Sequence, residues 1–308
     1  MQIQRRGFLA AAGGAVASFA GCTAFGGESP AASVTGEELT LATTTSTQDT
    51  GLLGEVNARF QRRFGIRVAT VAKGTGAALR TARDGDADVV MVHARSLEDD
   101  FMRDGHGVNR RDLMFNDFVV VGPAADPAGI RGSGDAAAAF TAVAGAGADG
   151  DATFVSRGDD SGTHTREKAI WEAADADPGG EWYVETGQGM GNTLTVADQQ
   201  GGYTLSDRGT HLSMRSNLDL EILLQGPVRG GDETLINPYG VVAVNPAVHP
   251  DVAYDAAMAY VGYVTSPAAQ EIISNYTVDG EQLFYPEAVS ADPNFQQYVP
   301  EGWRAEEA

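Results

Sequence analysis

The segment Arg157 to His164, with the sequence Arg-Gly-Asp-Asp-Ser-Gly-Thr-His, contains a guanidinium, short hydroxyl side chains and two glycines. It directly precedes a predicted helix, 165–174. An Arg fork, hydroxyl donors and free backbone N–H groups at a helix N-terminus are the groups that bind a small anion. We therefore expect Arg157, Ser161, Gly162 and Thr163 to contact an anionic ligand.

Two further segments carry similar chemistry between a predicted strand and a predicted helix. The first is 43–49, Thr-Thr-Thr-Ser-Thr-Gln-Asp, in which Asp49 is expected to cap a helix that runs to about residue 64. The second is 73–76, Lys-Gly-Thr-Gly. Their hydroxyl and N–H donors predict further ligand contacts, at Thr44, Thr45, Ser46, Thr75 and Gly76. We expect these segments to face Arg157 across a cleft and to close on one oxyanion.

Other interpretations of the Arg157 segment remain open at this point. Its Gly, Asp and Ser residues also suit a strand-to-helix turn with no function beyond capping. The string further resembles the Gly-Asp-Ser-Gly-Gly of trypsin-like proteases, which would make Ser161 the nucleophile of a secreted hydrolase. That fold is all-β and disulfide-linked, whereas this chain has one cysteine and five scattered histidines. A nucleophilic serine also needs an oriented base, so we expect no catalytic residue.

The charged neighbours of the proposed donors have to be compatible with an anion. Asp159 and Asp160 would repel a dianion if they pointed at it, so we expect one of them to brace Arg157 from behind. Lys73 could add positive charge or lie on the surface. For Arg208, in a similar turn at 206–210, a salt bridge at a helix start is the favoured interpretation.

The elements that must position these residues alternate between strand and helix. Strands are predicted at 39–43, 66–72, 87–92 and 152–156, each followed by a turn and a helical pattern. This alternation predicts an α/β fold of mainly parallel sheets flanked by helices, with ligands at the carboxyl ends of the strands.

The chain is also long enough for two lobes. Two apolar runs, at 113–123 and 237–246, are predicted to cross between the lobes as a hinge. Lobe I would then contain residues 39–118 and 240–308, and lobe II residues 119–239.

The N-terminus predicts export. Residues 1–21 contain a twin arginine and a short apolar run, which resembles a Tat signal peptide that ends in a lipobox, Phe19-Ala20-Gly21-Cys22. The usual lipobox has Leu where Phe19 stands. Cys22 is the only cysteine, so no internal disulfide can form, and we expect it to carry a lipid. Residues 22–38 are predicted to be a flexible tether between this anchor and the fold.

The composition is strongly acidic. The formal net charge is −21, and the chain has two lysines against 19 arginines. Such a Lys-poor, acidic surface is typical of haloarchaeal proteins and makes nucleic acid an unsuitable partner. The same charge should repel an anion, but at 1 M salt the Debye length falls to ~3 Å. Local donors then decide the field inside a narrow cleft.

Taken together, the motifs resemble those of the tungstate-binding, TupA-like proteins of ABC importers. The resemblance covers almost the whole chain after the signal peptide and rests on the segments 43–53, 74–76, 115–123, 156–164, 203–210 and 237–239. It implies a two-lobed, type II periplasmic-binding-protein-like fold with two hinge crossings. It also implies a monomeric extracytoplasmic receptor, without catalysis or cofactor, that delivers an oxyanion to a permease driven by an ATPase.

The identity of the anion stays open between related oxyanions. Tungstate and molybdate are proton-free dianions at neutral pH, so a selective site should offer only donors. Phosphate-binding proteins of the same fold use a related string, Arg-x-Asp-x-Ser-Gly-Thr, which residues 157–163 also fit. Monohydrogen phosphate carries a proton and needs a carboxylate acceptor. The segment 44–47 supplies hydroxyls, and Asp49 is expected to be occupied as a helix cap, so a proton-free anion such as tungstate or molybdate is favoured. Sulfate is proton-free as well, and only the size of the cavity would exclude it. A metal would enter only as the oxyanion.

Overall fold

The computed structural model describes residues 38–159, 161–278 and 280–289, which all belong to one compact unit, Ala32–Ala308. The predicted signal peptide, Cys22, almost all of the tether, Asp160 and the tail from residue 290 lie outside the described residues. No helix in the described part is long and apolar enough to cross a membrane.

Helices and strands alternate along the first two thirds of the chain, in agreement with the sequence. The elements, in chain order, are β1 (Glu38–Thr44), α1 (Thr45–Asp49), α2 (Leu52–Phe64), β2 (Arg67–Lys73), α3 (Thr75–Arg83), β3 (Val89–Val92), α4 (Arg95–Arg103), β4 (Gly107–Pro123), α5 (Ala136–Ala148), β5 (Phe154–Ser156), α6 (Gly162–Ala173), β6 (Tyr183–Glu185), α7 (Met190–Gln200), β7 (Thr204–Asp207), α8 (Arg208–Met214), η1 (Arg215–Asn217), β8 (Leu220–Leu224), η2 (Pro227–Arg229), η3 (Glu233–Leu235), β9 (Ile236–Val244), α9 (Tyr254–Val264), α10 (Pro267–Asn275), β10 (Thr277–Val278), β11 (Glu281–Gln282) and β12 (Tyr285–Pro286).

The largest sheet has the strand order β12-β4-β9-β3-β1-β2, and β7 and β8 also pair with β4. The expected parallel pairing holds where β1 lies between β2 and β3, and again between β5 and β6. The crossing strands β4 and β9 pair antiparallel with each other, and β9 pairs antiparallel with β3. The sheet therefore contains both parallel and antiparallel pairs. The antiparallel pairs arise because β4 and β9 are not joined to their neighbours by the strand–helix–strand connections that parallel pairing needs.

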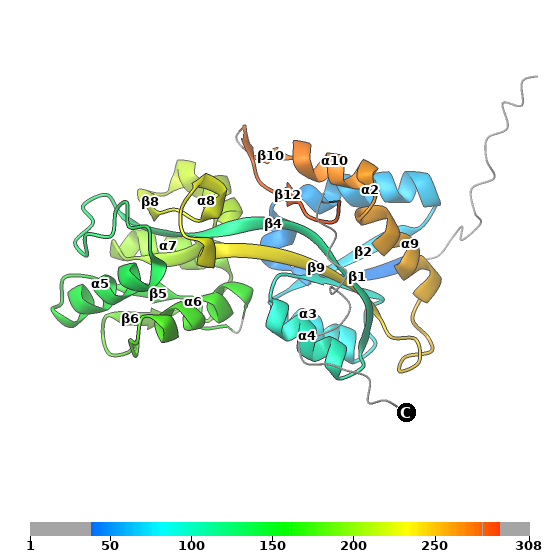
Figure 1. The fold of residues 1–308 in the computed structure, drawn as a ribbon, viewed down its shortest axis with the longest axis horizontal. Helices are drawn as coiled ribbons and strands as arrows, with labels where there is room; N and C mark the ends of the chain where they lie inside the picture. The colour runs from blue at the N-terminus through cyan, green and yellow to red at the C-terminus, as the bar shows by residue number, and fades with distance from the viewer. Residues whose placement is uncertain (1–37, 160, 279, 290–308) are drawn as a thin grey trace, which may run out of the picture. The chain divides into compact units, whose positions relative to one another are not determined.

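Strands β4 and β9 run side by side through both groups of elements (Figure 1). Leu113 of β4 and Val241 of β9 belong to a core with β1, β3, α2, α9 and α10. Further along β4, Phe118 and Val120 belong to a second core with α5, β5, α6 and β7. Strand β4 thus changes its packing partners near Asn116, which pairs with Asn237 of β9 in the ladder.

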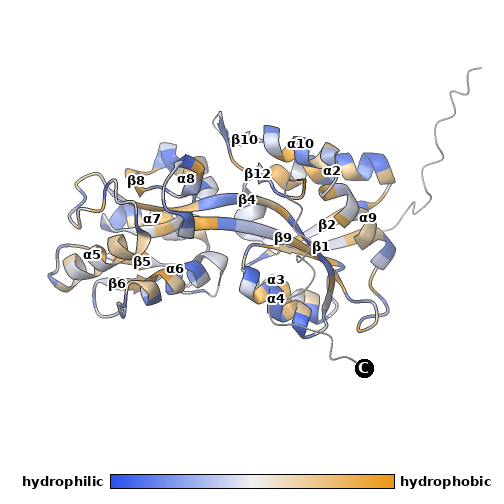
Figure 2. Cartoon of the chain, viewed as in Figure 1, coloured by the Kyte–Doolittle hydropathy of each residue, from blue (hydrophilic) through white to orange (hydrophobic). Residues whose placement is uncertain are grey.

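Helix α2 is one of the amphipathic helices that cover the sheets, with hydrophilic and hydrophobic residues along it (Figure 2). In α2, Leu52, Val56 and Phe60 are buried, whereas Arg59 and Arg62 are exposed. This spacing of apolar residues places one stripe of the helix against the core. The charged face toward solvent agrees with the acidic, arginine-containing composition.

One sequence prediction about this region is wrong. Asp49 does not cap the helix that runs to Phe64, because it is the exposed last residue of the separate short helix α1. Gly51 precedes α2 with φ 83°, a left-handed conformation that interrupts the helix. A Cβ at Gly51 would also lie 2.7 Å from the hydroxyl oxygen of Tyr276, so a side chain does not fit there.

Candidate anion-binding site

The first group of hydroxyls lies where β1 ends and α1 begins. Thr44 is the N-cap of α1, and its Oγ1 accepts a hydrogen bond from the Thr47 backbone N–H at 3.2 Å. The same oxygen lies 3.1 Å from Ser46 Oγ and 2.6 Å from Thr47 Oγ1. Thr44 and Ser46 are buried, and Thr45 is half-buried. Because capping fixes the start of α1, these hydroxyls are held together at the carboxyl end of β1.

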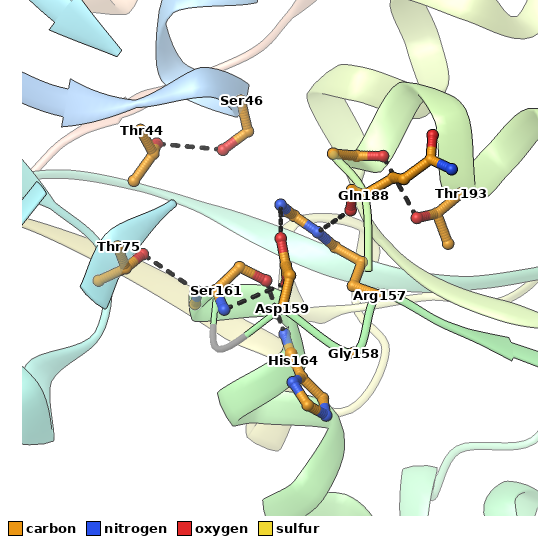
Figure 3. Close-up of polar contacts among 12 residues, drawn as sticks. Thr44, Ser46, Thr75, Arg157, Gly158, Asp159, Ser161, His164, Gln188 and Thr193 are labelled. Carbon is orange, nitrogen blue, oxygen red and sulfur yellow. Dashed lines mark hydrogen bonds and ion pairs between the residues drawn. The ribbon is translucent and has the colours of Figure 1, made fainter. Parts of the chain in front are cut away.

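A second contact joins two helix N-termini that are far apart in the sequence. Thr75 is the first residue of α3 and Gly162 the first of α6. The backbone N–H of Gly162 donates to Thr75 Oγ1 at 3.1 Å. Thr75 is fully buried, and the neighbouring Gly76 is half-buried. Figure 3 shows Thr75 and Ser161 close to each other, with Thr44 and Ser46 on the same side as Thr75.

Arg157 follows β5 and is only 3% exposed. Its Nη2 donates to Asp159 Oδ2 at 2.5 Å, and its Nε donates to the carbonyl oxygen of Gln188 at 3.3 Å. Asp159 Oδ1 in turn accepts from the Ser161 backbone N–H at 3.2 Å. The guanidinium is therefore held in place while its Nη1 takes no part in these contacts (Figure 3).

The start of α6 provides two hydroxyls with different roles. Ser161 is the N-cap, and its Oγ accepts from the His164 backbone N–H at 3.1 Å. These contacts describe a helix cap and not a nucleophile paired with a base. Thr163 Oγ1 is buried and has no hydrogen-bond partner within the part of the chain that the structure describes. An unpartnered buried hydroxyl is costly, and a ligand with acceptor oxygens would satisfy it.

The other cations named from the sequence are occupied elsewhere. Lys73 is exposed, and its Nζ donates to Thr81 Oγ1 at 2.8 Å. Arg208 is buried and donates twice to Asp117, from Nε at 2.6 Å and from Nη2 at 2.7 Å. Arg208 is the first residue of α8, so it forms the salt bridge at a helix start that the sequence predicted.

A nearby carboxylate, Asp207, is also fully engaged. Its two oxygens accept from the N–H and the hydroxyl of Thr210, at 2.8 and 2.7 Å. Burial raises the pKa of Asp207, while the positive charge of Arg157 opposes that shift. The acids around Arg157 thus face backbone donors, hydroxyls or the guanidinium itself.

His93 is a buried residue of this region that the sequence analysis did not select. Its Nε2 lies 3.3 Å from Ser46 Oγ, and its Nδ1 lies 2.9 Å from Asn237 Oδ1. Burial, together with the charge of Arg157, lowers its pKa to about 4, so the ring is neutral at ordinary pH. The sequence feature that could have identified His93 is its position directly after β3, at the same carboxyl edge of the sheet as Thr44.

Comparison with known proteins shows the family of the chain. Residues 28–268 match the family model described as the PBP superfamily domain. The chain is 60% identical to a Haloferax volcanii protein with the provisional name ABC transporter anion-binding protein, over 97% of this chain and 91% of that protein. It is 41% identical to the tungstate-binding protein TupA of Peptoclostridium acidaminophilum, over 80% of this chain and 85% of that protein.

A solved structure extends the likeness to three dimensions. The structure described as the tungstate ABC transporter from Geobacter sulfurreducens is 51% identical, with a TM-score of 0.71. The match covers 79% of this chain and 100% of that one. The chain therefore belongs to the PBP superfamily and, within it, to the TupA family of solute-binding proteins of ABC transporters.

Proposed function

We propose that this protein captures a tetrahedral dianion, tungstate or molybdate, and delivers it to the permease of an ABC importer with its ATPase. The observation that carries the proposal is the convergence of buried donors from three helix starts around Arg157. Thr44, Ser46 and Thr75 supply one side of the site, and Arg157 and Thr163 the other. The names of its relatives, which bind tungstate or anions, support the same ligand class.

The ligand set follows from the chemistry of these groups. Thr45 and Gly76 add donors beside Thr44 and Thr75, and Ser161 adds its hydroxyl beside Thr163. The Gly162 N–H would have to leave Thr75 Oγ1 to reach the anion. Asp159 stays behind Arg157 as a brace, and we assign no catalytic residue, cofactor or resident metal. A charge-assisted contact from a guanidinium, together with N–H groups at helix starts, is strong for a dianion.

A proton-free anion suits the site better than monohydrogen phosphate. Phosphate needs an acceptor for its proton, and the nearby carboxylates of Asp159 and Asp207 are already engaged by donors. Thr163 Oγ1 is a donor without a partner among the described residues, which favours a fully deprotonated anion. Sulfate meets the same condition, so size decides between it and the larger tungstate.

We further propose that capture closes two lobes, 39–118 with 240–308 and 119–239, around a hinge in β4 and β9. The division of the hydrophobic cores along β4, with Leu113 in one core and Phe118 in the other, supports this boundary. A ligand that touches both sides favours the closed conformation, because it gains contacts that the open one lacks. The permease could then distinguish loaded from empty receptor.

The receptor is extracytoplasmic, as are ABC solute-binding proteins of this family. We propose that it is exported by the Tat route, held to the outer face of the membrane by a lipid on Cys22, and monomeric. The acidic composition and the Haloferax relative support a haloarchaeal setting. Cys22→Ser should move the protein from the membrane fraction to the medium, and retention of that variant on membranes would refute the anchor.

Titration calorimetry in molar KCl tests the ligand assignment. We expect tungstate and molybdate to bind at least tenfold more tightly than sulfate, and phosphate to bind more weakly still. Tighter binding of phosphate or sulfate would replace the proposed ligand by that anion. Absence of binding by all four anions would refute the receptor function.

A further inference from the structure

A chain of hydrogen bonds connects the proposed anion site to the crossing strands. Ser46 Oγ lies 3.3 Å from His93 Nε2, and His93 Nδ1 lies 2.9 Å from Asn237 Oδ1. Asn237 Nδ2 donates to Asn116 Oδ1 at 2.7 Å. Asn116 and Asn237 are register partners in β4 and β9. All of these residues are at most 4% exposed, so water competes little for their hydrogen bonds.

The acceptors in this chain of hydrogen bonds determine where its protons lie. The amide oxygen of Asn237 can only accept, so His93 carries its proton on Nδ1. The bare Nε2 can then only accept, and the Ser46 hydroxyl must donate to it. In this direction Ser46 presents lone pairs, which would repel a dianion.

The same four residues can also form an unbroken chain of hydrogen bonds in which every donor and acceptor is exchanged. With the proton on Nε2, His93 donates to Ser46, and the Ser46 proton becomes free for an anion. Nδ1 then accepts from Nδ2 of a turned Asn237 amide. The Asn237 oxygen accepts from Asn116 Nδ2 once the Asn116 amide has turned as well, because Asn116 now presents its Oδ1 to Asn237. Asn116 Nδ2 is buried and has no partner among the described residues. Each direction joins the four residues by three hydrogen bonds, so a contact between Ser46 and an anion can select one of them.

We propose that His93 is a positioning residue whose tautomer decides whether Ser46 donates to the anion. The same chain of hydrogen bonds links anion capture to β4 and β9. This inference rests on the proposed function. In the exchange, the Nδ1 proton leaves to water and another proton reaches Nε2 from water, so the net charge does not change.

His93 stays neutral in both directions because its surroundings oppose an imidazolium. Burial lowers its pKa to about 4, and the charge of Arg157 acts in the same direction, although the bond to Asn237 opposes both. Two further guanidiniums, Arg95 and Arg166, line a cavity of about 250 Å³ together with His93. Tyr239, which stacks on the ring at 4.8 Å, has its pKa raised by burial and stays neutral as well.

Nuclear magnetic resonance of the full chain with ¹⁵N-labelled histidine tests the proposal directly. The chain has five histidines, and His93→Gln identifies the signals of His93 by their loss. We expect a proton on Nδ1 without tungstate and on Nε2 at saturating tungstate. The same tautomer in both states, or protons on both nitrogens after binding, would overturn the inference.

A double-mutant cycle provides a second test through affinity. His93→Phe keeps a ring against Tyr239 and removes both nitrogens, and it should weaken tungstate binding about fivefold. In a Ser46→Ala background the same change should have less than about a twofold effect, because no hydroxyl remains to be oriented. Equal losses in both backgrounds would contradict the proposal, and His93→Gln replaces His93→Phe in the cycle if that variant does not fold.

The two proposals fail in different ways. If the wild-type chain binds neither tungstate nor molybdate, the proposed function is refuted and the inference falls with it. If tungstate binds and the His93 tautomer stays the same, only the role of His93 is refuted.

Discussion

At the scale of single residues, Arg157 is the group on which the proposed anion site depends most. It is buried, and contacts with Asp159 and the Gln188 carbonyl fix its guanidinium. A fixed guanidinium loses little entropy when it binds an oxyanion, and it offers a planar fork that lysine lacks. Arg157 therefore contributes both a positive charge and hydrogen-bond donors in fixed positions.

Replacement of Arg157 should separate these two contributions. Arg157→Ala should weaken tungstate binding at least tenfold, because charge-assisted hydrogen bonds are lost. Arg157→Lys keeps the charge without the planar fork, so its affinity for tungstate should lie between those of the wild type and Arg157→Ala. Calorimetry measures both variants against Arg131→Ala, which removes an exposed arginine paired with Glu221 and should bind normally. Unchanged affinity in Arg157→Ala would show that the site lies elsewhere.

Glu167 should make the stability of the protein depend on pH. It accepts hydrogen bonds from Ser156, Trp171 and Tyr183, yet burial raises its pKa to about 7. Because this folded-state pKa lies above the ordinary value of 4.5, the folded protein binds the proton more tightly than the unfolded chain. The resulting stability is complete below the ordinary value and is lost as the pH rises through about 7.

Glu167→Gln tests this linkage. The wild-type free energy of unfolding should decrease between about pH 5 and about pH 8 relative to the variant, by about 3 kcal/mol at most. Glu172→Gln, at an exposed position of the same helix, should keep the wild-type profile. Parallel profiles for wild type and Glu167→Gln in chemical denaturation would show that Glu167 does not titrate in this range.

At the scale of elements, the start of α6 is a close contact between segments that are far apart in the sequence. Gly162 donates to Thr75 and packs against His93. A Cβ at Gly162 would lie 2.8 Å from the His93 ring and 3.0 Å from its carbonyl oxygen. Both neighbours are held by surrounding structure, so this glycine permits the close approach.

Gly162→Ala should therefore weaken tungstate binding about tenfold by forcing α6 away from β3, since overpacking commonly costs 1–3 kcal/mol. The matched control is Gly189→Ala at the N-cap of α7, where a Cβ would meet nothing within 4 Å. Calorimetry should give wild-type affinity for the control. Equal affinities for both variants would mean that this contact is not used in the bound state.

The elements also show how far the sequence alone could lead. Alternating apolar patterns and Gly-containing turns predicted most strands and helices, because those signals are local. The cap of α2 was mispredicted because Thr44 and Gly51, and not Asp49, fix the helix starts there. His93 was missed because its partners Ser46 and Asn237 are distant in sequence and belong to no local motif.

At the scale of the whole molecule, two hydrophobic cores share the strand β4, which pairs with β9. A ligand that binds the folded chain between segments from both sides must stabilise it as a whole. At a tungstate concentration of 100 times Kd the expected gain is about 2.7 kcal/mol. Thermal unfolding should show a higher Tm with tungstate, and Arg157→Ala should lose most of the increase. An equal increase in both proteins would indicate binding outside the proposed site.

The claim on which the account depends is that one oxyanion lies between Arg157 and the hydroxyls of Thr44, Ser46, Thr75 and Thr163. Anomalous diffraction from crystals grown with tungstate locates the tungsten atom directly. We predict one strong peak whose oxygens lie within hydrogen-bond distance of Arg157 and Thr163. A peak at another place on the chain, or none in crystals at saturating tungstate, would contradict the account.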